Sequence, residues 1–230
     1  MTPLWIIGSG GHAKVVIDTA RASGRFEVAG VLDDDPRRRE TRVLGIPVRA
    51  EASPEAVDRL GVRLAVIAVG CNRARAGIAR RLDGLLTWAA VVHPTAYLAE
   101  GVTLGEGSVV CAGAILQPDA VIGRHAIVNT AASVDHDSLV GDFTHVAPGA
   151  RLAGDVRLGP GAFLGIGSSV LPRCSVGAWA TIGGGGVVTR DIPPGVTAVG
   201  VPARPVAGEP GRTTALELGQ ASAGHPLSLS

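Results

Sequence analysis

An aliphatic residue stands at every sixth position between Val92 and Val188, without exception. The series comprises Val92, Leu98, Leu104, Val110, Leu116, Ile122, Val128, Val134, Val140, Val146, Leu152, Leu158, Leu164, Val170, Val176, Ile182 and Val188. An amphipathic helix has a period of 3.6 residues and a half-buried strand a period of two, so neither explains this pattern. A strict period of six is typical of a parallel β-helix built from hexapeptide repeats.

Each six-residue step is expected to form a short strand and a tight turn. Three steps close a triangular coil, and strand pairing stacks the next coil about 4.8 Å above it. The aliphatic residue should point into the prism. The residue four places later is small in almost every step, with Val102 and Val156 as exceptions, so it should sit where the chain turns a corner. Glycine often follows the aliphatic residue directly, which favours turns with unusual φ.

Composition limits the function classes. The net charge of +1 provides no field for nucleic acid or anionic membranes, and the aromatic content of 3% disfavours base-stacking surfaces. No apolar run approaches the about 20 residues of a membrane span, and no signal peptide is evident. Cysteines 71, 111 and 174 are widely spaced and odd in number, which indicates a reducing, cytoplasmic compartment and no zinc framework.

The chain divides into three regions by pattern. Residues 1–86 alternate expected strands (4–7, 26–32, 62–69) with expected helices (12–23, 72–82, and one capped by Ser53), so they should form a small α/β domain. Residues 87–207 should form the prism. Residues 208–230 are rich in Gly, Ala, Ser and Thr without a period, so a disordered tail is expected.

A glycine-rich loop follows the first expected strand. The sequence Gly8-Ser9-Gly10-Gly11-His12 places bare backbone at a helix start, where N–H groups can hold a phosphate. Asp33 and Asp34 end the next strand, about where a Rossmann domain contacts a ribose. Ala13 stands in place of a third glycine, and 86 residues hold only one mononucleotide half. A tight turn without a ligand therefore stays open as an alternative.

The combination of motifs is more specific than any one of them. A GSGGHA loop, an LDDD strand end, a VGCN strand end and hexapeptide coils resemble, over residues 4–206, the bacterial sugar-nucleotide N-acetyltransferases. The resemblance implies a left-handed β-helix that moves an acetyl group from acetyl-CoA, without a metal, to the amine of a UDP- or GDP-linked amino sugar. On the acceptor side it implies contacts from Gly10, Gly11, His12, Asp33 or Asp34, Gly70, Asn72 and Asn129.

The same resemblance assigns the chemistry. The family motif Asn-Thr-x-x-Ser-Val-x-His-[Glu/Asp] matches from Asn129 to Asp137, which implies that His136 is the general base and Asp137 its orienter. Without the motif, His136 would be taken for a solvated surface residue. Gly154 lies eighteen residues later, one coil above, where its N–H could bind the thioester oxygen. His145, Ile166 and Gly184 match positions that contact acetyl-CoA.

A homotrimer is expected from the placement of the two matched histidines. His145 lies half a coil from His136, so the two cannot meet within one chain if both point outward. Prisms packed side by side would bring different faces together, with active sites between subunits.

Three alternatives remain open at this point. A β-helix carbonic anhydrase needs three stacked histidines, but His125, His136 and His145 are spaced by 11 and 9 residues instead of 18. O-acetylation of a sialic acid or a related sugar is the main competitor within the acyltransferases. A non-catalytic solenoid that binds a sugar nucleotide is the third.

Overall fold

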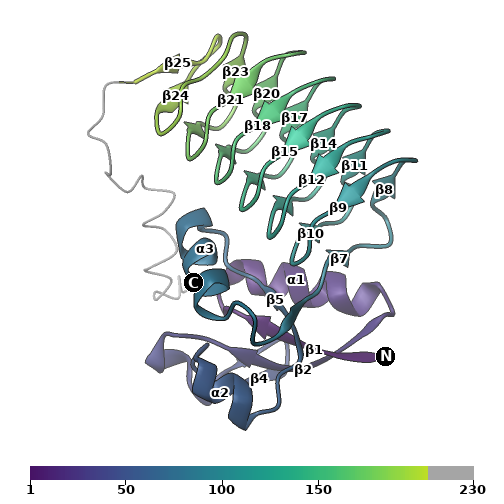
Figure 1. The fold of residues 1–230 in the computed structure, drawn as a ribbon, viewed down its shortest axis with the longest axis vertical. Helices are drawn as coiled ribbons and strands as arrows, with labels where there is room; N and C mark the ends of the chain where they lie inside the picture. Colours follow the sequence, from purple (N-terminus) through teal and green to yellow (C-terminus); the bar gives the residue numbers. More distant parts are fainter. Residues whose placement is uncertain (207–230) are drawn as a thin grey trace, which may run out of the picture.

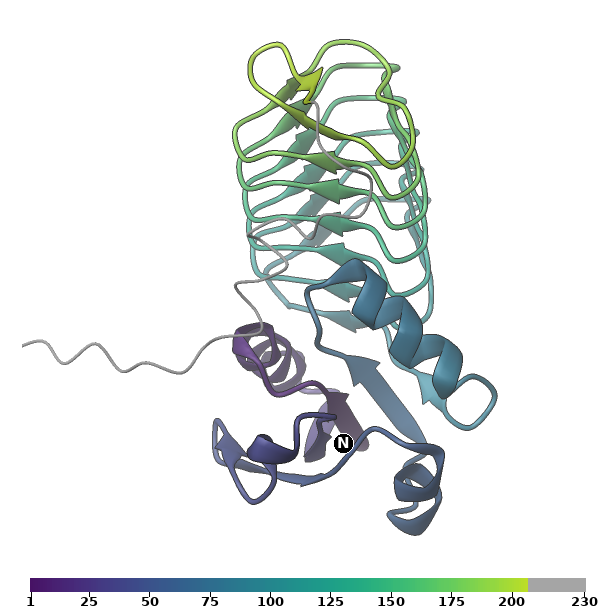
Figure 2. The same cartoon turned by 90° about the vertical axis from the view of Figure 1, so that its left-hand side faces the viewer.

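The computed structural model describes residues 1–206, and the expected disordered tail at 208–230 lies outside them. An α/β domain forms the N-terminal part, and a prism of stacked coils follows it (Figure 1). Figure 2 shows the stack of coils above the α/β domain. Among the described residues, no helix combines the length and apolar content needed to cross a bilayer.

The α/β domain contains a six-stranded sheet in the order β3-β4-β2-β1-β5-β6. Only the β3–β4 pair is antiparallel. Because β2 lies on one side of β1 and β5 on the other, the strand order reverses beside β1, where α/β sheets bind ligands. The strands are β1 (Thr2–Ile7), β2 (Phe26–Leu32), β3 (Arg42–Val43), β4 (Ile46–Ala50), β5 (Leu64–Ile67) and β6 (Thr87–Trp88).

Helices cover both faces of this sheet. Leu4 and Ile6 of β1 pack against α1 (Gly11–Ala22), and this cluster continues into outward residues of the first coils. Ile7, on the other face, belongs to the cluster of α2 (Pro54–Arg59) and α3 (Asn72–Arg81). A short 3-10 helix, η1 (Pro36–Arg38), follows β2. The expected cap of α2 is confirmed, because Ser53 Oγ accepts the N–H of Ala56 at 3.2 Å.

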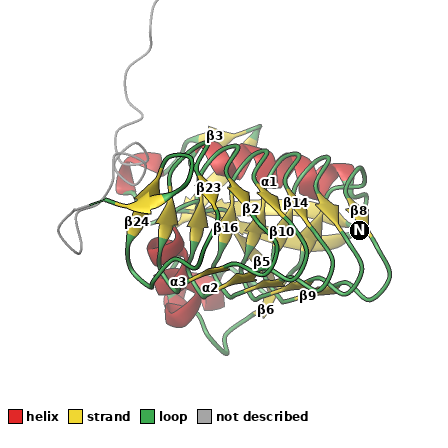
Figure 3. Ribbon diagram, turned by 90° about the horizontal axis from the view of Figure 1, so that it is seen from above, coloured by secondary structure: helices red, strands yellow, loops and turns green. Residues whose placement is uncertain are grey.

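Two-residue strands build the three faces of the prism (Figure 3). Face 1 contains β7 (Val91–Val92), β10 (Val109–Val110), β13 (Ile127–Val128), β16 (His145–Val146), β19 (Phe163–Leu164), β22 (Thr181–Ile182), β24 (Thr197–Val199) and β25 (Arg204–Pro205). Face 2 contains β8 (Tyr97–Leu98), β11 (Ile115–Leu116), β14 (Ser133–Val134), β17 (Arg151–Leu152), β20 (Ser169–Val170) and β23 (Val187–Val188). Face 3 contains β9 (Thr103–Leu104), β12 (Val121–Ile122), β15 (Leu139–Val140), β18 (Arg157–Leu158) and β21 (Ser175–Val176).

From β7 to β23, neighbouring strands on each face pair in parallel with a register of eighteen residues, as Val110 with Val128. The seventeen aliphatic residues fill the interior: fourteen are buried, and Val92, Leu98 and Leu104 of the first coil are half-buried against the same cluster. The predicted uninterrupted prism with inward aliphatic residues is confirmed.

Three vertices join the faces, and they are named here by position. The far vertex (99–102, 117–120, 135–138, 153–156, 171–174) joins faces 2 and 3, opposite face 1. The near vertex (105–108, 123–126, 141–144, 159–162, 177–180) joins faces 3 and 1. The side vertex (111–114, 129–132, 147–150, 165–168, 183–186) joins faces 1 and 2.

The explanation given to the glycines after the aliphatic residues was wrong. Positive φ occurs three residues after the aliphatic residue, as at Gly107 and Gly113, and not at glycines such as Gly123. A Cβ on Gly123 would lie 2.6 Å from the backbone N of Asp142 in the next coil. These glycines are therefore required because successive coils approach too closely there for a side chain.

The prism was expected to span residues 87–207, and its two ends show details that the repeat did not predict. β6 pairs with β5 in the α/β sheet, so the domain ends two residues later than the expected boundary at 86. After β23 the chain still places Ile192 and Ala198 in the core, and β24 and β25 form an antiparallel cap. The Pro193-Pro194-Gly195 turn therefore interrupts the repeat without ending the prism.

Candidate active site

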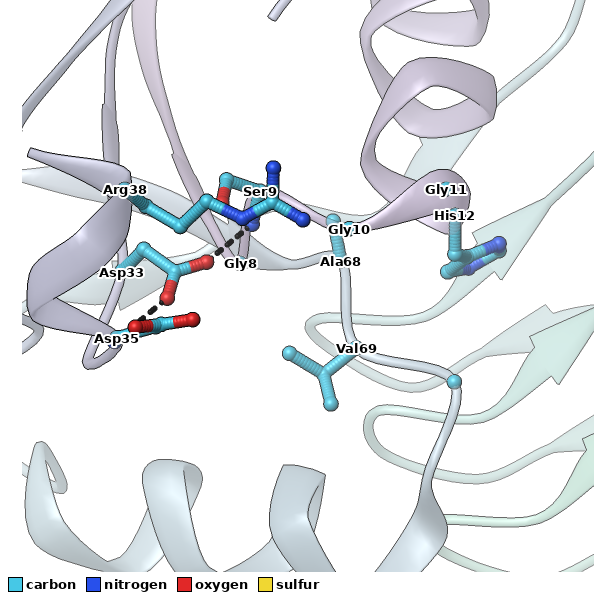
Figure 4. Close-up of a pocket in the computed structure, with 11 residues that line it drawn as sticks. Gly8, Ser9, Gly10, Gly11, His12, Asp33, Asp35, Arg38, Ala68 and Val69 are labelled. Atoms are coloured by element: carbon cyan, nitrogen blue, oxygen red, sulfur yellow. Dashed lines mark hydrogen bonds between the residues drawn. The ribbon is translucent and has the colours of Figure 1, made fainter. Parts of the chain in front are cut away.

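A pocket of about 420 Å³ lies at the carboxyl ends of β1, β2 and β5 (Figure 4). This is the position where the strand order of the sheet reverses. Three segments far apart in the sequence supply its walls. The lining residues are Gly8, Ser9, Gly10, Gly11, His12, Asp33, Asp35, Arg38, Ala68, Val69 and Gly70.

The glycines of the first loop have different roles. Gly8 has φ +106°, and a Cβ there would lie 2.7 Å from Val69 Cγ2, so the turn itself requires glycine. A Cβ added to Gly10 or Gly11 would meet nothing within 4 Å, so protein packing does not require these two residues to be bare. They open the twelve-residue helix α1, whose first N–H groups can bind an anion. Their exposed backbone is available for a phosphate of a ligand.

Only one of the two candidate aspartates faces the pocket. Asp33 accepts the N–H of Ser9 at 2.6 Å and that of Asp35 at 2.8 Å, so it fixes the glycine loop against the end of β2. Asp34 turns away, accepts the N–H of Ala52 at 3.0 Å and pairs with Arg81 at 2.6 Å. Asp33 and not Asp34 therefore lines this pocket, because the direction of a side chain at a strand end follows its local hydrogen bonds.

Sequence reasoning missed two residues of the pocket, Asp35 and Arg38. Figure 4 shows the Arg38 side chain extending across Asp33 toward Ser9. The Asp35 carboxylate pairs with Arg37 at 2.9 Å, and this hydrogen-bonded partner holds the pKa of Asp35 below its usual value. The Asp-Asp-Asp-Pro-Arg-Arg-Arg run was the available signal, but it does not reveal which of its charges face inward.

The loop after β5 joins the pocket to the prism. Gly70 lines the pocket, whereas the side chain of Asn72 points into the seam between the domains. Asn72 Nδ2 donates to the carbonyls of Gly161 (3.0 Å) and Ala162 (3.1 Å) on the near vertex. The amide of Asn72 is committed to the prism and its side chain does not line the pocket, so the contact of Asn72 with the acceptor stays a prediction.

His145 points away from the prism interior, as expected, but the α/β domain covers it, leaving 8% of the residue exposed. Its Nδ1 lies 3.2 Å from the Gly70 carbonyl and its Nε2 3.1 Å from Asn129 Nδ2. The carbonyl can only accept, so Nδ1 carries the proton and Nε2 accepts from Asn129. The Asn129 carbonyl oxygen in turn accepts the N–H of Thr130 at 2.8 Å. Asn129 thus orients His145.

His12 lies beside His145, with 6.0 Å between ring centroids. Burial, reinforced by the charge of Arg75, lowers the pKa of His12 to about 4 and that of His145 to about 3. Both rings are therefore neutral at physiological pH. Figure 4 shows the His12 ring directed away from Asp33, so its backbone, and not its ring, is suited to meet a phosphate.

His136 stands on the far vertex, and 63% of its side chain is exposed. Its Nδ1 lies 2.7 Å from Asp137 Oδ2. This hydrogen bond, aided by the negative charges of Asp137, Asp135 and Asp155, raises the pKa of His136. With the proton held on Nδ1, Nε2 is left as the acceptor, which is the arrangement of a general base.

Gly154 lies directly above His136, as the eighteen-residue register predicts. The N–H of Asp155 donates to the His136 carbonyl at 2.9 Å, and a Cβ on Gly154 would lie 2.5 Å from His136 Nε2. Glycine is therefore required to leave room for the ring. Within residues 1–206, no protein acceptor takes the N–H of Gly154. This donor beside a base is suited to bind a developing oxyanion.

Ile166 and Gly184 lie together on the side vertex, away from Gly154. The N–H of Gly185 donates to the Ile166 carbonyl at 2.8 Å, and 63% of Ile166 is exposed. The residues matched to acetyl-CoA are thus split between the far vertex, the side vertex and the buried face 1.

A single chain therefore presents two separate halves of a site. The pocket belongs to the domain packed on face 1, while His136 and Gly154 stand on the vertex opposite that face. The width of the prism separates the two halves.

The histidines of the prism do not converge. His125 is buried between Trp88 and Phe143, His136 is exposed on the far vertex, and His145 is covered by the α/β domain. Among residues 1–206, no group of three or more His, Cys, Asp or Glu side chains could hold a metal ion. The placement of the three rings does not support a β-helix carbonic anhydrase.

Comparison with known proteins places this geometry in a family. The family model of the PglD N-terminal domain matches residues 3–82. A histidine-to-asparagine variant of perosamine N-acetyltransferase from Caulobacter crescentus, solved with CoA and GDP-perosamine, superposes with a TM-score of 0.84 at 42% identity, covering 90% of this chain and 98% of that one.

Two further relatives, one a solved structure and one a sequence match, are also sugar-related acetyltransferases by name or share this fold. The acetyltransferase domain of PglB from Neisseria gonorrhoeae FA1090, in complex with acetyl coenzyme A, has a TM-score of 0.79 at 37% identity and covers 89% of this chain and 98% of that one. The UDP-N-acetylbacillosamine N-acetyltransferase of Bacillus subtilis (strain 168) is 40% identical over 112 residues. That match spans 46% of this chain and half the length of the curated relative.

Proposed function

Because the chain belongs to the acetyl-CoA-dependent sugar-nucleotide N-acetyltransferases with a left-handed β-helix, we propose that it acetylates the amine of a nucleotide-linked amino sugar at a site that joins two subunits. The observation that carries the proposal is the His136–Asp137 pair beneath the unpartnered N–H of Gly154.

The reaction is acyl transfer through a tetrahedral intermediate. The sugar amine attacks the carbonyl carbon of the acetyl thioester while His136 Nε2 takes a proton from the amine. Asp137 holds Nδ1–H and stabilises the imidazolium that forms. The Gly154 N–H donates to the oxyanion, and the intermediate collapses as the C–S bond breaks and coenzyme A leaves as a thiolate.

The acceptor nucleotide belongs in the pocket of the α/β domain. The bare backbone of Gly10 and Gly11 at the start of α1 supports a diphosphate contact. Arg38 extends across the same pocket and adds a positive charge, and Asp33 braces the loop that presents the N–H groups. A sugar bound there would project toward the edge of the prism.

A homotrimer would unite the two halves of the site. Face 1 is occupied by the chain's own domain, which leaves faces 2 and 3 for neighbouring prisms. Exposed aliphatic and aromatic residues on those faces support such contacts: Tyr97 and Ile115 on face 2, Val121 and Leu139 on face 3. We propose that contacts between neighbouring prisms bring the far vertex of one chain to the pocket of the next.

The donor would then lie between subunits. Gly154 of one chain meets the thioester, while Ile166 and Gly184 of the neighbour line the path of the coenzyme A arm. His145 is covered by the α/β domain, so it does not meet the donor directly. It holds Gly70 and the neighbouring loop of the acceptor pocket in place.

We also propose a cytoplasmic location. The three cysteines are free, as expected in a reducing compartment, and acetyl-CoA is a cytoplasmic metabolite.

The decisive experiment is a thiol-release assay with acetyl-CoA against UDP- and GDP-linked amino sugars, with hydroxyl-only sialic acids as the competing acceptors. We expect release with an amino sugar and loss of the amine in the product. In His136→Ala, kcat should fall by roughly 10²–10⁴ while the affinity for acetyl-CoA is retained. Transfer to a hydroxyl acceptor, or near-normal turnover by His136→Ala, would reject the proposal.

A further inference from the structure

Arg75 is the largest fully buried side chain of the described residues, with 0% exposure. It lies in α3, at the seam between the α/β domain and the prism. Within residues 1–206, no carboxylate forms an ion pair with it. Burial lowers the pKa of Arg75 to about 9, which leaves the side chain charged at neutral pH.

The guanidinium group divides its donors between the two domains. Toward the acceptor pocket, Nη1 donates to the carbonyls of Val69 (2.8 Å) and Gly70 (3.2 Å). Toward the near vertex of the prism, Nε donates to the carbonyl of His125 (2.8 Å) and Nη2 to that of Phe143 (2.8 Å).

Asn72 extends the same network. Its carbonyl oxygen accepts from Arg75 Nη2 at 2.8 Å, while its amide donates to the prism. The loop 69–72 thus lines the pocket on one side and is bound, through Asn72 and Arg75, to three successive coils on the other. Every partner of Arg75 on the prism is a backbone carbonyl, whose position is fixed by the stacked coils.

The need to hold the two domains together does not by itself explain why a charged side chain is buried between them. Desolvating a guanidinium group is costly, and apolar residues of similar volume usually hold an interface as well or better. What arginine provides here is a planar fork that fixes directions on both sides at once. Acyl transfer is sensitive to such placement, since a displacement of about 1 Å can cost about 10²-fold in rate.

We propose that Arg75 is a positioning residue of the transfer reaction: it fixes the acceptor loop 69–72 to the near vertex, so that the bound amino sugar is held at one height along the prism. This inference rests on the proposed function. Arg75 does not touch either substrate and acts through the backbone of Val69 and Gly70.

The test compares Arg75→Met and Arg75→Lys with two controls. Arg80→Met removes an exposed arginine from the same helix, and Ile17→Ala destabilises the core of the same domain without removing any hydrogen bond of Arg75 or Asn72. All proteins are assayed well below their thermal midpoints. We expect kcat to fall about 10²-fold in Arg75→Met, with KM for acetyl-CoA unchanged.

Arg75→Lys should recover thermal stability but not kcat, because a single ammonium group cannot span both domains. If Arg75→Met does not fold, this variant carries the test. Wild-type kcat in the folded Arg75 variants, or an equal loss in Ile17→Ala, would overturn the proposal.

A second readout separates this inference from the proposed function. If the wild-type protein releases no thiol with any amino sugar, the proposed function fails. The positioning role of Arg75 is then tested by amide hydrogen exchange in residues 68–72. Faster exchange in the Arg75 variants, and not in Arg80→Met or Ile17→Ala, would support it, and unchanged exchange would refute it.

Discussion

From Leu98 to Ile182, the third residue after each inward aliphatic adopts a left-handed conformation, and glycine fills only some of these positions. Eight others in the prism hold non-glycine residues with positive φ: Asp119, His125, Ala131, Asp137, Phe143, Asp155, Arg173 and Trp179. Such a residue costs about 1 kcal/mol or more. At Asp137, with φ +60°, the turn brings the carboxylate back beside the preceding residue, so strain in the coil contributes to the orientation of His136.

Asp137→Asn should change both the rate and its pH dependence. The Asp137 hydrogen bond raises the pKa of His136, and the neutral base is lost as the pH falls through that pKa. Without the carboxylate the pKa falls, so the acidic limb of kcat/KM should move to lower pH. The plateau should drop by roughly 10²-fold or more, because Nδ1–H loses its orienter.

The matched control for this variant is Asp135→Asn. Asp135 acts on His136 by charge alone, so this change should shift the limb less and leave the plateau in place. A pH–rate profile for each variant decides the matter. If the acidic limb of kcat/KM did not move in Asp137→Asn, the hydrogen bond from Asp137 would not control the pKa of His136.

Gly154→Ala should reduce turnover without destabilising the prism. The new Cβ would lie 2.5 Å from His136 Nε2 and 2.6 Å from Cε1, so the ring must rotate away from the reacting amine. We expect kcat to fall by about 10²–10³. The thermal midpoint should stay close to the starting value, because the vertex is solvent-exposed. Full activity would contradict a tight packing of ring and glycine.

The family motif pointed to His136 and Asp137, and the eighteen-residue register then placed Gly154 one coil above His136. Asn72, Asp34 and Arg75 could not be placed in this way. Their roles depend on which way a side chain turns at a strand end or at the seam, and local hydrogen bonds decide that direction.

At the level of elements, the repeat was the stronger predictor. Strand β2 (Phe26–Leu32) was predicted to the residue, and each prism strand from β7 to β23 ends on a predicted aliphatic. The cap after residue 188 was not foreseen, because Ile192 and Ala198 enter the core out of the six-residue period. The glycines that often follow an aliphatic residue were predicted to serve turns with unusual φ. Their actual role, to let successive coils approach closely, cannot be seen in the sequence pattern alone.

Gly11→Val tests whether the start of α1 binds the acceptor. The position has ordinary φ and open space, so the protein should fold, while the added side chain should block close approach of a phosphate. We expect KM for the nucleotide sugar to rise steeply and KM for acetyl-CoA to stay constant. Steady-state kinetics with each substrate varied in turn measures both.

Gly77→Val provides the control, because Gly77 is an exposed helical glycine of α3 with equally open space. It should change neither constant. A rise in both constants in Gly11→Val, or in the donor constant alone, would contradict the separation of acceptor and donor sites between the two domains.

At the level of the whole molecule, the arrangement of the two halves of the site supports the proposed trimer. The α/β domain covers face 1, and the shared cluster of α1 with Val109 and Ile127 fixes it there. His136 stands on the opposite vertex and cannot serve the pocket of its own chain. The sequence suggested a trimer from the spacing of His136 and His145. The stronger reason is that the pocket and His136 lie on opposite sides of the prism, and only the structure reveals this arrangement.

This opposition predicts complementation between two inactive chains. His136→Ala keeps its pocket but lacks the base, whereas Gly11→Val keeps the base but has an impaired pocket. In mixed trimers formed by co-expression, a site is active when Gly11→Val supplies the base and His136→Ala supplies the pocket. Every mixed trimer contains one such site among its three, so purified mixed trimers should recover about a third of wild-type activity at low nucleotide-sugar concentration. Differently tagged chains purified in tandem confirm that mixed trimers are assayed, and the two variants mixed without subunit exchange should stay inactive. Mixed trimers without recovered activity would place the base and the pocket of each site in the same chain.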